Sequence, residues 1–107
     1  MIEWREQARL MEDERMLRIA RAQGAHGAET ARIYANILQR RALEAFDELR
    51  LDEALDLAER EFEFCSRAFG LTHEFSRAAH RCLSALRRQS RTKLLEMQAA
   101  LDVCLMV

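Results

Sequence analysis

The feature that most constrains the fold of this chain is an internal self-similarity with a period of 46 residues. Arg21-Ala22-Gln23-Gly24 returns at positions 67–70 as Arg-Ala-Phe-Gly, and the segment 49–56 returns in outline at 95–102. In both copies a small hydroxyl residue, Thr30 or Ser76, follows the glycine by six positions. A repeat of this length is typical of helical hairpins that stack side by side and hold another protein.

The composition indicates an all-α chain. There is no proline among the 107 residues and there are only three glycines, while half of the residues are hydrophobic and a third are charged. Ala, Leu, Arg and Glu dominate, and all four favour helices. The length fits one domain with a modest core. We therefore expect antiparallel helical hairpins, about four to five helices in all, in a single domain spanning 1–107.

The apolar spacing and the repeat together place the helices. A first helix is expected over 2–22, a second from about Ala28 to 46–49, and a third that ends at Gly70. Thr72 is the expected N-cap of a fourth helix. The repeat then predicts a turn near 95–97, which gives units of about 3–48, 49–94 and a partial 95–107. The alternative is one continuous helix over 72–106, because nothing local breaks it. The expected core positions are Ala54, Ala58, Phe62, Cys65, Phe69, Leu83 and Leu86.

Two segments carry a resemblance to a known family. Residues 49–62 are similar to the opening of a hairpin helix in the tetratricopeptide repeat (TPR), in particular the longer repeat of kinesin light chains. Residues 69–78 resemble the family's next segment, with Gly70, His73 and Ser76 in register. The chain departs from the pattern where Leu49 replaces a turn glycine and Glu61 replaces a packing alanine, and no proline follows His73.

The resemblance implies a scaffold or adaptor that binds a peptide or helix of a partner protein. In such a repeat the first helix of each hairpin lines a concave face. The residues that this assigns to partner binding are Thr30, Tyr34, Ile37, Arg41, Ser76, His80, Leu83 and Arg87.

The residue pattern offers no catalytic or metal site. No pair of His or Cys residues has the short spacing of a zinc site, and we expect His73 to cap or pack at its turn. There is no nucleophile elbow and no glycine-rich phosphate loop. We therefore expect a protein that is not an enzyme and that needs no cofactor.

The charge balance argues against nucleic acid and membrane as partners. The formal net charge is −1, and an acidic stretch over 44–63 precedes a basic stretch over 77–93. We expect these two helices to lie antiparallel and pair their charges, or to line different partner surfaces. No apolar run approaches the roughly 20 residues of a membrane span. Three widely spaced cysteines fit free thiols, and hence a cytoplasmic location.

An alternative function is a self-associating helical bundle, such as a small chaperone or an assembly subunit. The C-terminal residues are too apolar for a solvated helix end, and an exposed patch of this kind marks an interface. It would be covered by another copy, another chain or the first helix. The residues assigned to this interface are Trp4, Leu101, Val103, Leu105 and Met106, with Met11 and Met16 joining them in the bundle.

Overall fold

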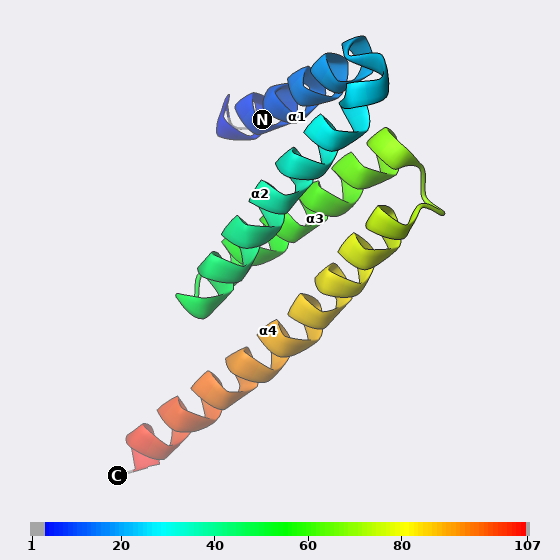
Figure 1. Cartoon of the computed structure of the whole chain (residues 1–107). Coiled ribbons are helices and arrows are strands. Elements are labelled where there is room, and N and C mark those ends of the chain that lie inside the picture. The colour runs from blue at the N-terminus through cyan, green and yellow to red at the C-terminus, as the bar shows by residue number, and fades with distance from the viewer. Residues whose placement is uncertain (1–3, 107) are drawn as a thin grey trace.

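The structure, a computed structural model, describes residues 4–106, and of Arg5, Glu6 and Met106 it describes the backbone alone. The predicted all-α class is confirmed. Four helices follow one another: α1 (Trp4–Ala22), α2 (Gly27–Asp47), α3 (Leu51–Phe69) and α4 (Glu74–Met106), with a short 3-10 helix, Gly24–His26, before α2. Neighbours α2, α3 and α4 run antiparallel, and α1 crosses the upper end of the α2–α3 pair (Figure 1).

Two glycines build the corner between α1 and α2. Gly24 has a φ of 58°, a left-handed conformation that glycine adopts without steric cost and that ends α1 as predicted. Gly27 is the first residue of α2. A Cβ atom at Gly27 would lie 1.9 Å from the carbonyl oxygen of Ala20, so only glycine allows the two helices to approach this closely.

The turn between α2 and α3 lies where the repeat predicts it. The amide of Arg50 donates to the carbonyl of Ala45, and the amide of Leu49 donates to that of Phe46, which together form a Schellman cap. Leu49 has a φ of 63° in the position that glycine usually occupies. Behind the turn the two helices approach closely through fully buried alanines: Ala42, Ala45, Ala54 and Ala58.

The turn between α3 and α4 begins at Gly70, which has a φ of 93° and ends α3 as expected. The hydroxyl of Ser76 donates to the carbonyl of Gly70 at 2.7 Å. The expected cap at Thr72 is wrong. His73 is the residue before α4, and its Nδ1 accepts a hydrogen bond from the amide of Phe75 at 3.0 Å. His73 therefore caps the turn, and its ring stacks on Phe69.

The predicted turn near 95–97 is also wrong, because α4 runs without interruption to Met106. The expected unit boundary at 94–95 falls inside this helix, and the continuous-helix alternative describes the chain. The segment 91–106 contains no glycine or proline that would end a helix. As Figure 1 shows, the second half of α4 projects past the α2–α3 turn. The radius of gyration is 16.8 Å, against about 13 Å for a compact chain of this length.

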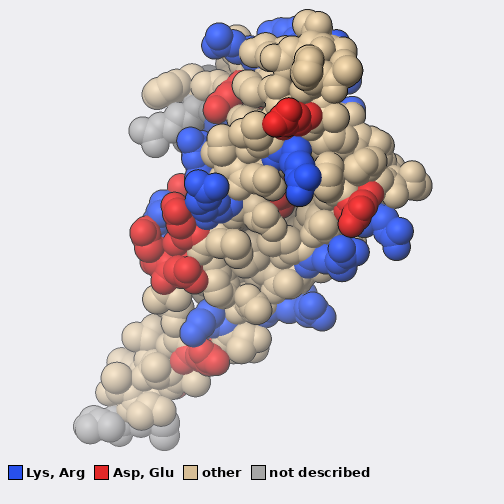
Figure 2. All heavy atoms as spheres, in the orientation of Figure 1, with Lys and Arg blue, Asp and Glu red and all other residues tan. Residues whose placement is uncertain are grey.

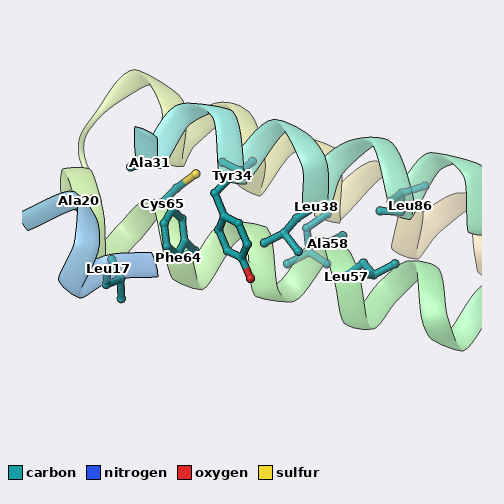
Figure 3. Packing of buried hydrophobic residues seen from close by; sticks show 14 residues of the cluster. Leu17, Ala20, Ala31, Tyr34, Leu38, Leu57, Ala58, Phe64, Cys65 and Leu86 are labelled. Carbon is teal, nitrogen blue, oxygen red and sulfur yellow. The ribbon is translucent and has the colours of Figure 1, made fainter. Parts of the chain in front are cut away.

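The core lies between α2, α3 and α4 and is closed by α1 (Figure 3). Leu38, Phe64 and Leu17 are among its most deeply buried side chains, and the ring of Tyr34 meets that of Phe64 edge-on at 4.8 Å. Of the predicted core, Ala54, Ala58, Cys65, Leu83 and Leu86 are buried. Phe62 and Phe69 pack against the core but remain partly exposed, because they lie at the α3–α4 side of the stripe.

Candidate interaction surface

The eight predicted partner-binding residues do not form one exposed face. Arg41, His80 and Arg87 are exposed, and Thr30 and Ile37 are half-buried. Tyr34, Ser76 and Leu83 are buried inside the chain, so they are not available as surface contacts. The register of α2 explains the correction. Its inner face carries Ala31, Ala35 and Leu38, and Tyr34 lies between them, while its neighbour Ile33 faces outward.

Tyr34 belongs to a buried polar cluster that joins three helices. Its hydroxyl donates a hydrogen bond to Asp13 of α1. Arg60 of α3 donates to the same carboxylate at 2.8 and 3.1 Å, and to the Tyr34 oxygen at 3.2 Å. Burial, followed by the hydrogen bond to Asp13, raises the pKa of Tyr34. Every member has a partner inside the cluster, so its role is to fix α1 on the α2–α3 pair.

The charged stretches of α3 and α4 meet as expected at one described pair. Arg87 of α4 donates to Glu59 of α3 at 3.1 Å, and both side chains are about half exposed. The two helices run antiparallel (Figure 1). Arg77, Arg81 and Arg88 are exposed on the outer side of α4. A pair this exposed contributes only about 0–1 kcal/mol, so it favours an orientation more than it adds stability.

The predicted interface residues lie at two separate places. Leu101, Val103 and Leu105 are exposed on the end of α4, Trp4 is exposed at the start of α1, and the side chain of Met106 lies outside the described residues. In the part of the chain that the structure describes, the backbones of α1 and α4 do not approach each other closely. The first helix therefore does not cover the C-terminal residues. Of the three expected alternatives, another copy and another chain remain.

The end of α4 forms a free helix, which we call the α4 tail and define as residues 91–106. Every described side chain from Arg91 to Leu105 is exposed, whereas Ser90 just before it is buried. Sixteen residues of α-helix extend about 24 Å. On the face of the molecule that Figure 2 shows, this end is mostly uncharged surface.

One face of the α4 tail continues the core. The buried residues Ala79, Leu83, Leu86 and Ser90 follow one another at spacings of three or four. The same spacing leads on to exposed residues of the tail, so they lie on the same side of the helix. We call this face the tail stripe, and its members are Leu94, Met97, Leu101 and Leu105.

Leu94, Met97 and Leu49 are surface residues that the sequence reasoning did not assign to the interface. The continued 3.6-residue spacing after Leu86 is the signal that identifies the first two. Leu49 is 53% exposed at the tip of the α2–α3 turn, in a backbone conformation that disfavours leucine. Nearby, Phe46 and residues 88, 89, 92 and 93 of α4 line a shallow groove.

A small cavity near Glu61 holds the clearest unsatisfied polar group. Glu61 is 4% exposed, and its Oε1 atom has no hydrogen-bond partner. Burial raises its pKa to about 7. Burial and the Glu61 charge also raise the pKa of Cys65, to about 12, so this thiol is not a nucleophile near neutral pH. Asn36 and Gln39 line the same cavity.

Within residues 4–106 the His, Cys, Asp and Glu side chains form no group of three suited to a metal ion. None of the described helices is both long and apolar enough to cross a membrane.

The comparisons with known proteins find no match: neither a protein-family model, nor a curated protein, nor a solved structure resembles the chain at a significant level. The likeness to tetratricopeptide repeats therefore rests on the residues quoted above and on nothing else.

Proposed function

We propose that this chain is a protein–protein interaction module that binds an α-helix of another chain along the tail stripe. One observation carries the proposal: the apolar face that packs in the core continues for about four turns beyond it, onto a helical segment whose described side chains are all exposed. An isolated helix of this length is marginal in water, and packing of its apolar face is what stabilises it. A helix that packs along this stripe would cover it in the way that α2 and α3 cover the same face in the first half of α4.

A matched pair of leucines tests this proposal. Leu101 lies on the stripe and is 59% exposed, whereas Leu95 lies on another side of the same helix and is 71% exposed. Affinity capture with the intact chain, read by mass spectrometry, should recover at least one protein with the wild type and with Leu95→Glu. A second copy of the chain counts as such a protein. Leu101→Glu should lose it. Equal recovery with all three chains would show that the stripe is not the binding surface.

We also place this module in the cytoplasm. The three cysteines are all free, with Cys65 buried and Cys104 exposed, and free exposed thiols persist in reducing compartments. Alkylation of the native protein in freshly lysed cells should modify Cys104 without prior reduction. A disulfide at Cys104 in the native protein would contradict this location.

A further inference from the structure

The chain exposes more surface than a compact monomer of its size. A compact monomer of 12.5 kDa exposes about 6,200 Å². This chain exposes 7892 Å². The difference, about 1,700 Å², exceeds the surface of about 800 Å² that each partner of a standard interface buries. The α4 tail contributes to this surplus, because every described side chain in it is exposed.

Charged residues flank the tail stripe on both of its edges. Arg91 and Asp102 are eleven residues apart, which is three helical turns, so they lie on the same edge of the stripe. Lys93 lies on the opposite edge, where it pairs with Glu96 of its own helix at 3.7 Å. This edge is therefore basic at the start of the tail and acidic near its end. Two tails that run in opposite directions would bring the basic end of each next to the acidic end of the other.

These charges select an antiparallel pair of tails. When two identical helices pack antiparallel with Met97 at the midpoint, the same edges face each other. Arg91 then lies beside Asp102 of the second copy, at both ends of the pair. In a parallel pair Arg91 would face Lys93 of the second copy at the same level, which is a repulsive arrangement.

The tip of the α2–α3 turn lies beside the start of the α4 tail. A second tail in this position runs back along the stripe toward the body. Its end reaches the level of residues 88–90, where the hairpin tip lies. Leu49 is exposed at this tip, so in the proposed pair it is the apolar residue available to the end of the second tail, which carries Leu105. An exposed leucine with a φ of 63°, where glycine would be strain-free, fits a residue retained for a contact.

From these three observations we infer that the chain forms an antiparallel homodimer, in which the α4 tail of each copy packs on the tail stripe of the other. The arrangement is isologous and closed, so the second copy leaves no tail stripe open for further growth. This inference rests on the proposed function and names the partner helix as the chain's own tail.

Sedimentation velocity of the full chain over a concentration series tests the dimer. Wild type and Leu95→Glu should shift from monomer to dimer with equal dissociation constants. Leu101→Glu should raise the dissociation constant at least about tenfold, with an unchanged helical signal by circular dichroism. A wild type that stays monomeric up to high concentration, or a Leu101→Glu chain that dimerises normally, would overturn the inference.

Charge reversal and cross-linking test the orientation. Arg91→Glu and Asp102→Arg should each weaken the dimer, and the double variant should restore it. In a Cys104→Ser background, Met97→Cys should give a disulfide-linked dimer on oxidation. Leu94→Cys should not, because in an antiparallel pair the two sites lie about 9 Å apart along the helix axis, beyond disulfide reach. Equal cross-linking at both sites would indicate a parallel pair and overturn the arrangement.

The two proposals fail in different ways. If the chain is monomeric at every concentration, and Leu101→Glu alone still loses a captured protein, the homodimer is wrong and the interaction module stands with another partner. If Leu101→Glu changes neither self-association nor capture, both are wrong.

Discussion

Arg60 donates two hydrogen bonds to Asp13, at 2.8 and 3.1 Å, across the interface between α3 and α1. Both side chains are nearly buried, and the hydroxyl of Tyr34 donates to the same carboxylate. Desolvation lowers the pKa of Arg60, but the hydrogen bond to Asp13 and its charge outweigh this, so the net pKa is raised and the ion pair persists. The position of α1 depends on this pair, because α1 contributes few apolar residues to the core.

Asp13→Ala should therefore destabilise the fold strongly. Removing the carboxylate leaves the Arg60 guanidinium and the Tyr34 hydroxyl without their acceptor, and breaking a buried pair costs about 3–5 kcal/mol. Urea denaturation measures the loss. The matched control is Asp56→Ala, which removes an exposed pair with Arg9 at 2.9 Å and should cost about 0–1 kcal/mol. A similar, small loss for both variants would contradict a structural role for the cluster.

Glu61 should make stability depend on pH. Its pKa is about 7 in the folded chain, against an ordinary value of 4.5. Between these two values the folded state binds more protons than the unfolded state, so the free energy of unfolding falls as pH rises from about 4.5 to 7 and then levels off. The loss is on the order of 3 kcal/mol. Glu61→Gln should be more stable than the wild type at pH 8.

Thermal or urea unfolding of both chains across this pH range measures the effect. Ionisable groups that are common to both chains cancel in the difference between the two curves. Parallel stability curves for the wild type and Glu61→Gln would show that Glu61 does not hold a proton in the folded state.

Local signals predicted the helices well. Gly24 and Gly70 ended α1 and α3 because a left-handed residue closes a helix. The turn at Leu49 has no glycine in the left-handed position, and it was placed by the repeat alone. The same repeat predicted a turn at 95–97 that does not exist. A few residues shared between the two copies do not end a helix when the segment contains no glycine or proline. The repeat thus placed one of its two turns correctly, and the uninterrupted helix at 95–97 follows from the absence of glycine and proline there.

The candidate site was predicted only in part. Leu101 and Leu105 were identified from the apolar character of the C-terminus, and they are exposed. Tyr34 was assigned to a binding face by resemblance, but its hydroxyl pairs with Asp13, 21 positions away. Periodicity cannot predict such a pair. A charged residue on a helix is assigned to the solvent-exposed face, because the helical spacing does not show which residue of another helix the fold brings next to it.

Ala58→Glu should be among the most disruptive single substitutions. Ala58 is fully buried where α2 and α3 approach most closely. Overpacking costs roughly 1–3 kcal/mol, and the unpaired carboxylate adds more. Ala8 is exposed on α1, so Ala8→Glu is the matched control and should change stability by no more than about 0.5 kcal/mol. The two melting temperatures give the comparison. An unchanged value for Ala58→Glu would mean that the α2–α3 register differs from the one described.

Leu49→Gly separates stability from assembly. At a φ of 63° leucine is strained by roughly 1–2 kcal/mol relative to the right-handed conformation, and glycine is not. The added freedom of glycine in the unfolded chain offsets part of this, so the monomer should become more stable by up to about 1 kcal/mol. The same change removes the leucine that meets the second tail, so the dimer should become weaker. Urea denaturation of dilute protein measures the first effect and sedimentation velocity measures the second. If the variant is more stable and its dimer has the same dissociation constant as that of the wild type, Leu49 is not part of the interface.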